Sequence, residues 1–332
     1  MVITIILLAS LLLLCGCTGR GTMEENDANA PVTVEDKGRP TATDAPTTSA
    51  AVTSPLTGRP VLDEVSFSVP DPENTRGLPT AKIGHSYGVA KNGIVHDNSK
   101  NAQSFFESKG YRALCYDTTP GTKALYLTFD CGWENGYTSK VLDTLLEKKV
   151  PAAFFCTLEH IKSQPDLIAR MITEGHIVGN HSTKHPDFAK ISRERMAAEL
   201  LKCDNYLRQN FGYSTEFFRF PEGSYNESAL DLVGSMGYTS VFWSCAYADW
   251  DVKDTKGGEY AFKTVTSRLH PGAVILLHSV SPDNAAALGD IIDYARSQGY
   301  EFKALSDYRS PSAQLKKSSF GYCIKKRMMI YF

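Results

Sequence analysis

Short apolar runs alternate with amphipathic segments along most of the chain from about residue 124 onward. The runs are rich in Phe, Tyr, Val, Ile and Leu, a composition typical of strands buried within a parallel sheet. We therefore predict strands at Ala124–Asp130, Ala152–Thr157, Ile177–Ser182, Thr215–Pro221, Thr239–Cys245, Ala273–Ser279 and Tyr300–Ala304.

The segments between these runs carry apolar residues at helical spacing, which predicts helices at Ser139–Lys149, Pro165–Glu174, Ser192–Asn210 and Asn284–Gln298. A Pro at the start of the second helix and glycines just after the second and fourth are ordinary helix boundaries. Strands that alternate with helices indicate a parallel α/β fold with right-handed crossovers. This pattern alone leaves both an open sheet and a closed barrel possible.

The N-terminus carries a targeting signal. Its apolar run, residues 2–14, is too short to span a bilayer comfortably but suits a signal peptide. Gly16 directly before Cys17 resembles a bacterial lipoprotein processing site, so we predict a signal at 1–17 with a lipid on Cys17. The protein is then extracytoplasmic and tethered to the outer face of the bacterial membrane. A plain signal peptide or an uncleaved anchor are alternatives, since no Lys or Arg precedes the run.

Two further segments have compositions unlike that of a packed domain. Residues 18–60 are rich in Thr, Ala, Pro, Asp and Gly and poor in large apolar residues, so we predict a disordered linker. Residues 311–332 form a basic tail, either a surface segment near anionic polymers or a poorly ordered end. Residues 124–310 carry the alternating strands and helices, and we expect them to form the main domain.

Charge and cysteine content narrow the function classes. The 35 basic and 37 acidic residues nearly balance, so no broad basic field favours nucleic acid as a partner. Eight cysteines in 332 residues are too few and too scattered for a disulfide framework. We expect most of them to be small apolar residues of the core.

Polar residues at the ends of the predicted strands are the candidates for chemistry, because active sites of parallel α/β folds gather at the carboxyl ends of strands. They are Asp130, His181, Arg219, Asp249 and His278. His181 and His185 have a four-residue spacing that suits one zinc ion, although two hydrogen-bonded histidines are the alternative. A buried Arg219 needs a carboxylate partner, and Asp130 is the natural one.

The same segments, in order, resemble the five motifs of the NodB-like polysaccharide deacetylases, carbohydrate esterase family 4. The matching residues are Thr128-Phe129-Asp130-Cys131-Gly132, His181 to Pro186, Arg219 with Pro221 and Gly223, Asp249-Trp250, and Leu277-His278. The resemblance covers roughly residues 120–308. Within the family, the δ-lactam-biosynthetic branch is the most similar, through Glu134-Asn135-Gly136-Tyr137-Thr138 and through His278-Ser279-Val280-Ser281 followed by Asp283-Asn284-Ala285. Residues 61–123, which include Gly84-His85-Ser86-Tyr87-Gly88, resemble that branch's N-terminal extension of the catalytic domain.

This resemblance implies a distorted (β/α) barrel with about seven parallel strands and a set of residue roles. His181 and His185 would hold a divalent metal, with zinc preferred, while Asp130 acts as general base and His278 as general acid. Arg219 would orient Asp130, and Asp249 would stabilise the His278 imidazolium. The backbone N–H near Tyr225 would hold the oxyanion, and Trp250, Pro221 and Gly223 would complete the substrate site.

One position departs from the family pattern. The second Asp of the first motif, a metal ligand in the family, is Cys131 here. A thiolate there could bind zinc, or the thiol could face away and leave two protein ligands. Both possibilities stay open at this point.

The resemblance also implies a substrate class. The branch deacetylates N-acetylmuramic acid of peptidoglycan, and the freed amine closes a muramic δ-lactam, as in spore cortex. The alternatives are a GlcNAc or chitooligosaccharide deacetylase, an acetylxylan esterase, or a catalytically decayed glycan-binding lipoprotein. Retention of Asp130, both metal-site histidines, Arg219 and His278 favours an enzyme over the binding-only alternative.

Overall fold

The structure, a computed structural model, describes residues 52–308. The predicted signal with Cys17, most of the predicted linker and the C-terminal tail lie outside the described residues. Within 52–308, no helix combines the length and apolar character needed to cross a membrane.

A curled sheet of parallel strands forms the centre of the described part. The sheet consists of β2 (Ala113–Leu114), β3 (Ala124–Cys131), β4 (Ala152–Cys156), β5 (Ile177–Asn180), β6 (Phe217–Phe218), β8 (Thr239–Val241), β9 (Val274–His278) and β10 (Glu301–Phe302). Their order is β10-β3-β4-β5-β6-β8-β2, with β9 also paired to β3. Every pairing in this sheet is parallel.

The chain that follows β8 brings the sheet back onto itself. Cys245 forms a parallel bridge to Ile275 of β9, and the Leu276 N–H donates to the Cys245 carbonyl at 2.9 Å. Ser244 N–H donates to the Val274 carbonyl at 3.0 Å. These contacts link the two ends of the sheet, so the predicted distorted (β/α) barrel is confirmed.

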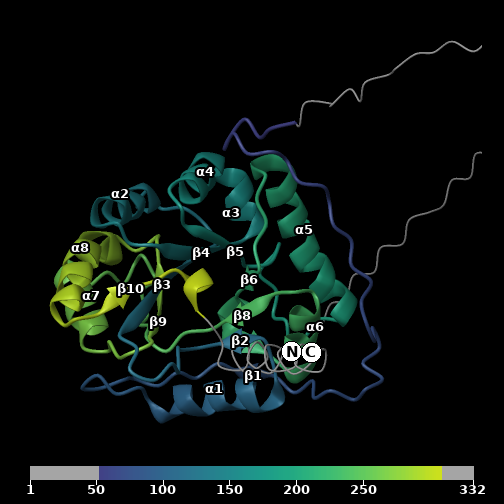
Figure 1. Cartoon of the computed structure of the whole chain (residues 1–332), viewed down its shortest axis with the longest axis horizontal. Coiled ribbons are helices and arrows are strands. Elements are labelled where there is room, and N and C mark those ends of the chain that lie inside the picture. Colours follow the sequence, from purple (N-terminus) through teal and green to yellow (C-terminus); the bar gives the residue numbers. More distant parts are fainter. Residues whose placement is uncertain (1–51, 309–332) are drawn as a thin grey trace, which may run out of the picture. The chain divides into compact units, whose positions relative to one another are not determined.

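Helices surround the strands in Figure 1. They are α1 (Asp97–Lys109), α2 (Thr138–Lys148), α3 (Leu158–Ser163), α4 (Pro165–Thr173), α5 (Arg193–Phe211), α6 (Glu227–Ser235), α7 (Gly258–Thr266) and α8 (Pro282–Ser297). The four predicted helices are found as α2, α4, α5 and α8, with ends shifted by one or two residues. Helix α5 begins where predicted because the Ser192 hydroxyl accepts a hydrogen bond from the Arg195 N–H.

Three predicted strands are much shorter than expected, and one of them, Tyr300–Ala304, is reduced to β10. The predicted strand Thr215–Pro221 is reduced to β6, and Thr239–Cys245 to β8. The Arg219 guanidinium explains part of this difference. It donates to the backbone carbonyls of Val241 at 2.8 Å and Phe242 at 3.3 Å. A side chain therefore occupies backbone acceptors where a longer strand would have used them for pairing.

The segment that precedes the barrel strands packs against its helices. Val65 exchanges two hydrogen bonds with the Asn205 side chain of α5, at 2.8 and 2.9 Å. Strand β1 (Ile83–Gly84) pairs antiparallel with β7 (Ser224–Tyr225). The predicted N-terminal extension thus lies in the same compact unit as the barrel.

The predicted linker boundary at residue 60 needs a correction. The Ser54 hydroxyl donates to the Asn210 carbonyl at 2.5 Å, and the Thr57 hydroxyl donates to the Phe211 carbonyl at 2.8 Å. These carbonyls belong to the last residues of α5 and have no partner within the helix. Residues 52–60 cap that helix end and are part of the folded unit.

Candidate active site

A cavity of about 720 Å³ opens at the carboxyl ends of the barrel strands. Its lining combines ionisable side chains with three tryptophans. The residues are Asp130, Gly132, Trp133, Thr157, Glu159, His181, Thr183, Lys184, His185, Glu222, Trp243, Trp250, Leu276 and His278. Of the predicted catalytic and metal residues, Asp130, His181, His185 and His278 line this cavity.

Asp130 lies at the end of β3 and is held by a fully buried arginine. Arg219 Nη1 donates to Asp130 Oδ1 at 2.7 Å, and its Nη2 donates to Thr128 Oγ1 at 2.9 Å. The guanidinium also lies over the Phe155 ring, 4.2 Å from its centroid. Burial would raise the pKa of Asp130, but the charge of Arg219 holds it below its usual value. Asp130 is therefore ionised and able to accept a proton.

His181 is positioned to offer a lone pair to the cavity. Its Nδ1 lies 2.8 Å from the Arg219 carbonyl, which can only accept, so Nδ1 carries the proton. Nε2 is left unprotonated and lies 3.7 Å from Asp130 Oδ2. Burial lowers the pKa of His181 to about 4, which keeps the ring neutral. The His185 ring lies beside it, with the centroids 4.9 Å apart.

The donor chemistry of these two histidines fits a divalent metal. Neutral imidazoles are common ligands of zinc, and a backbone acceptor on the far nitrogen is the usual way in which proteins orient them. The loop that carries them is held in an uncommon backbone conformation, with φ of 70° at Ser182 and 54° at His185. Buried Glu199 secures it by accepting from the Thr183 and Lys184 N–H groups at 2.9 and 2.8 Å.

His278 stands opposite Asp130 and is paired with a second carboxylate. The two residues are register partners on β3 and β9. His278 Nδ1 lies 2.7 Å from Asp249 Oδ1, and Asp249 Oδ2 accepts from the His278 N–H at 2.8 Å. Burial would lower the pKa of His278, but Asp249 raises it above its usual value. The site thus pairs an ionised carboxylate with an imidazole that favours its protonated form.

Comparison with known proteins decides the family. The polysaccharide deacetylase profile matches residues 117–241. Over 231 residues the chain is 40% identical to the peptidoglycan-N-acetylmuramic acid deacetylase PdaA of Bacillus subtilis, across 69% of this chain and 87% of that protein. The chain belongs to the polysaccharide deacetylase family.

Two further comparisons agree with this assignment. The solved structure of Bacillus subtilis PdaA, a family 4 carbohydrate esterase, aligns with a TM-score of 0.65 over 70% of this chain and 98% of that chain. The peptidoglycan-N-acetylglucosamine deacetylase of Bacillus cereus is 31% identical over 196 residues, 57% of this chain and 70% of that protein. This polysaccharide deacetylase is accordingly a hydrolase of carbohydrate esterase family 4.

In this polysaccharide deacetylase, Cys131 lies apart from the histidines of the cavity. Successive side chains of a strand point to opposite faces, so Cys131 faces away from the cavity that Asp130 enters. Its sulfur lies 3.4 Å from Ser279 Oγ, and the residue is buried and absent from the cavity lining. The structure therefore favours the possibility that the thiol faces away from a metal at His181 and His185.

Of the four other predicted substrate-site residues, one lines the cavity and three do not. Trp250 lines the cavity and is 58% exposed, with its ring centroid 6.0 Å from that of His278. Tyr225, Pro221 and Gly223 are buried and do not line the cavity among the described residues. Gly223 has a φ of 63°, and a Cβ there would lie 2.8 Å from the Trp243 ring. The turn therefore needs glycine to let Trp243 form a cavity wall.

Sequence reasoning missed two aromatic walls of this site. Trp133 follows the first motif and is 48% exposed, whereas Trp243 is almost buried. An aromatic residue directly after a strand-end motif is a signal that could have found Trp133. Trp243 carried no such signal, because it lies inside an apolar run that was assigned to a strand.

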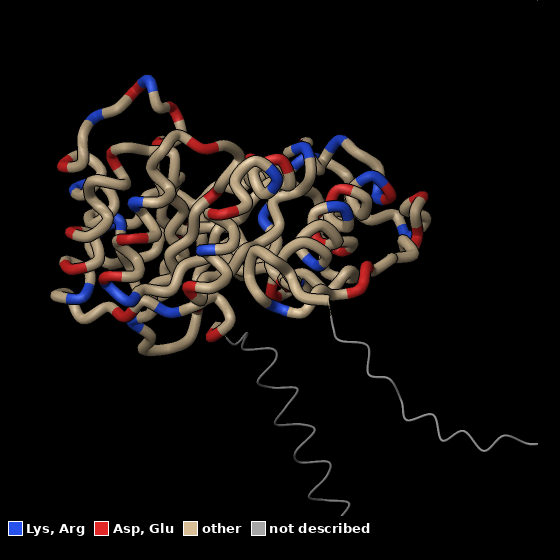
Figure 2. The backbone as a smooth tube through the Cα atoms, turned by 90° about the horizontal axis from the view of Figure 1, so that it is seen from above, with Lys and Arg blue, Asp and Glu red and all other residues tan. Residues whose placement is uncertain are grey.

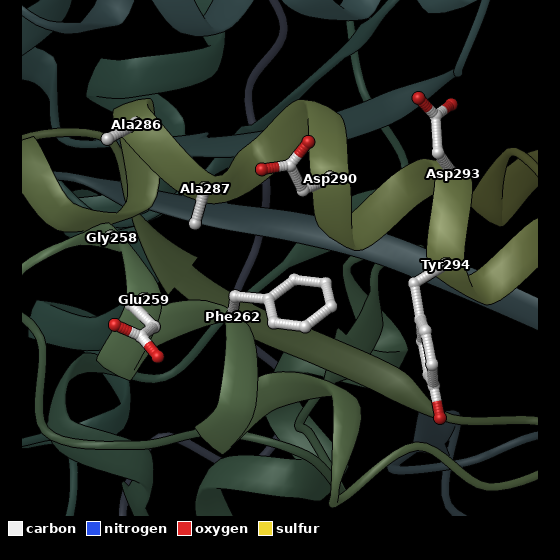
Figure 3. Close-up of a pocket in the computed structure, with 8 residues that line it drawn as sticks. All are labelled: Gly258, Glu259, Phe262, Ala286, Ala287, Asp290, Asp293 and Tyr294. Carbon is white, nitrogen blue, oxygen red and sulfur yellow. The ribbon is translucent and has the colours of Figure 1, made fainter.

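A second hollow, shown in Figure 3, lies between α7 and α8 and has a volume of about 490 Å³. It is bordered by Gly258, Glu259, Phe262, Ala286, Ala287, Asp290, Asp293 and Tyr294. These described residues include no histidine, cysteine or basic side chain, so the chemistry of the first cavity is not repeated there. Over the rest of the described surface, basic and acidic residues are interspersed, as Figure 2 shows.

Replacing Asp249 with Asn is expected to move the alkaline limb of the kcat/KM–pH profile to lower pH. If His278 acts as the general acid, as the family resemblance implies, it must be protonated, and the limb reports the pH at which it loses its proton. Without the carboxylate the pKa of His278 falls, so activity near neutrality drops roughly 10- to 100-fold. Asp251→Asn, which removes an exposed carboxylate two residues away, is the control. An unmoved alkaline limb in Asp249→Asn contradicts the assignment of His278 as the acid.

Proposed function

We propose that this protein removes N-acetyl groups from a cell-wall glycan by metal-assisted hydrolysis, with N-acetylmuramic acid of peptidoglycan as the preferred sugar. The main evidence is that one cavity holds two ion pairs, Asp130 with Arg219 and His278 with Asp249. A glycan-binding protein has no need of a base and an acid in these opposite protonation states. The relationship to a muramic acid deacetylase supports the choice of sugar.

The residues of the cavity divide the reaction between them. His181 and His185 would hold a divalent cation, with zinc preferred, and when bound it would polarise the acetyl carbonyl and lower the pKa of water. Asp130 removes a proton from the attacking water while Arg219 holds the carboxylate in place. The C–O bond to the acetyl carbon forms, the C–N bond breaks, and His278 donates a proton to the departing amine. The products are acetate and a free amino sugar.

Lys184 supports muramic acid as the sugar. Among the described residues that line the cavity, it is the only Lys or Arg. Its ammonium pairs with Glu159, and both side chains are 60% exposed, so this pair stabilises the fold very little. N-acetylmuramic acid carries a lactyl carboxylate, which N-acetylglucosamine lacks. Lys184 is free to exchange Glu159 for that carboxylate.

Replacing Lys184 with Gln is expected to raise KM for muramic acid substrates roughly two- to fivefold, the effect of one exposed ion pair. KM for chitooligosaccharides should stay unchanged, because they carry no carboxylate. Lys190→Gln, an exposed lysine outside the cavity lining, serves as the control. An equal change in KM for both substrates would contradict carboxylate recognition by Lys184.

The proposed function is tested by incubating the full chain and zinc with glycan strands from amidase-treated peptidoglycan, following acetate release and product mass. Loss of one acetyl group from each muramic acid supports the proposal, and subsequent δ-lactam formation can be followed in the same spectra. Release only from chitin oligomers or peptide-bearing peptidoglycan keeps the reaction and rejects the sugar. No release from any of these glycans, with metal bound, rejects the deacetylase function.

A tether through Cys17 would hold this site beside the cell wall, and we keep it as part of the proposal. It is supported by the lipoprotein-like segment Leu14-Cys15-Gly16-Cys17. Cys17→Ala should move the protein out of the membrane fraction of the producing bacterium. A Cys17→Ala protein that stays in that fraction would contradict lipidation.

A further inference from the structure

Three side chains with metal-ligand chemistry gather behind the active-site cavity, and the proposed reaction uses none of them. Cys131 ends β3, Cys156 ends β4, and His160 lies in the first turn of α3. The two cysteines are register partners, and the ligand atoms of all three residues lie within 4.8 Å of one another. Their exposed fractions are 0%, 0% and 1%. The cluster therefore lies in the core, on the opposite face of β3 from Asp130.

His160 is the unusual member of this cluster. Both of its ring nitrogens are buried, and neither has a hydrogen-bond partner among the described residues. A buried polar atom without a hydrogen-bond partner is unfavourable, so proteins rarely leave two on one ring. Burial lowers the pKa of His160 to about 4, which leaves the imidazole neutral with a lone pair to donate. Together with two thiols, such a ring has the donor set of a metal site.

We propose that Cys131, Cys156 and His160 bind a zinc ion, at a structural site separate from the one at His181 and His185. Thiolate and imidazole are the ligands that structural zinc sites use. Two thiolates also neutralise Zn²⁺, so the loaded site buries no net charge, whereas a single thiolate would leave one. The three side chains supply three of the four positions of a tetrahedral zinc site.

Binding requires small movements and releases protons. Zn–N and Zn–S bonds of about 2.0 and 2.3 Å place tetrahedral ligand atoms roughly 3.5–3.8 Å apart. Side-chain rotations must therefore bring closer together any two ligand atoms whose distance is near 4.8 Å. Each thiol loses its proton to solvent as its Zn–S bond forms, so the reaction needs no oxidant or reductant. Because both thiols must lose a proton to bind the metal, loading favours higher pH.

The site also explains why the metal ligand expected after Asp130 is a cysteine here. Cys131 directly follows the catalytic carboxylate, and His160 directly follows Glu159 at the cavity mouth. The Thr157 N–H already donates to the Cys131 carbonyl at 3.1 Å. A zinc ion at these ligands joins the ends of β3, β4 and α3 beneath the cavity and fixes the strand that carries Asp130.

Cobalt(II) spectroscopy on the full chain separates this site from the catalytic one. Thiolate ligands give Co²⁺ an intense near-ultraviolet charge-transfer band, which imidazole ligands alone do not. We expect the band in the wild type and in the double variant His181→Ala/His185→Ala, and a loss of at least tenfold in Cys156→Ser. Cys203→Ser is the matched control, since Cys203 is equally buried in the same core but outside the cluster. Zinc content should fall by one equivalent in Cys156→Ser.

Each of the following results overturns the proposal. A wild type that binds Co²⁺ without the thiolate band has no such site. A band that is lost in the double histidine variant but kept in Cys156→Ser assigns Cys131 to the catalytic metal. A mass lower by two hydrogens under non-reducing conditions in the wild type but not in Cys156→Ser, with no band, identifies a disulfide at Cys156 in place of the metal. If Cys156→Ser fails to fold, His160→Gln keeps both thiols and should weaken Zn²⁺ binding at least tenfold, and unchanged binding overturns the proposal. None of these readouts depends on deacetylase activity.

Discussion

Replacing Asp130 with Asn is expected to lower kcat/KM for deacetylation by roughly 10²–10⁴-fold, the range associated with a positioned general base. Asn has the same shape and keeps an oxygen that accepts from Arg219, so the geometry of the cavity should survive. It cannot take a proton from water, however, and it removes a negative charge that lies 3.7 Å from His181 Nε2. The loss should appear mainly in kcat, because the sugar contacts of the cavity walls remain.

The measurement is acetate release over a range of substrate concentrations, with zinc content and thermal unfolding recorded for the same protein. Glu159→Gln is the control, because Glu159 lines the same cavity but is largely exposed. It should change kcat/KM by only a few-fold. Activity of Asp130→Asn within tenfold of the wild type, with normal zinc content, would assign the base role to another group.

The chemical residues of this site could be predicted because they stand at the ends of strands. All parallel strands of a barrel present their carboxyl ends at one rim, so Asp130, His181 and His278 had to meet if the strand assignments were right. The helices were predictable for a similar local reason, since Ser192 and Pro165 are strong start signals. Local pattern was therefore sufficient wherever the fold repeats a simple unit.

Other features depend on contacts between residues far apart in the sequence. The shortening of β6 and β8 follows from a guanidinium that takes backbone carbonyls 22 and 23 positions away. The attachment of residues 52–60 to the end of α5 joins positions more than 150 apart in the chain. Composition suggested a flexible segment there, and it contains no information about a distant helix end that needs partners.

The orientation of Cys131 could not be settled from the sequence. Alternation along a strand places a residue that follows an inward-facing Asp130 on the opposite side, but the family resemblance makes the same position a metal ligand. The sequence also could not predict that Cys131 lies next to Cys156 and His160. This proximity depends on the register between β3 and β4.

Removing the side chain of Arg219 is expected to destabilise the fold more than removing any other single side chain. Arg219→Met should lower the free energy of unfolding by about 3–5 kcal/mol, because it leaves the buried Asp130 carboxylate without its cation. Three further acceptors, Thr128 Oγ1 and the carbonyls of Val241 and Phe242, lose a donor at the same time. Urea unfolding near neutral pH measures the difference. Arg170→Met is the control, since its ion pairs are partly exposed and should contribute at most about 1 kcal/mol.

The double variant Asp130→Asn/Arg219→Met tests whether the loss comes from the unpaired charge. Removing both partners should recover part of the stability lost in Arg219→Met, and the double-mutant cycle gives the coupling between the two side chains.

The pH dependence of stability provides a second check on the role of Arg219. In the wild type the pKa of Asp130 is lowered, so its contribution to stability is present above the unfolded-state pKa and is lost as pH falls through the folded-state pKa. Without Arg219 burial raises that pKa, so Arg219→Met should instead gain stability relative to the wild type as the medium becomes acidic. A constant difference between the two proteins at all pH values would contradict a charge-based role for Arg219.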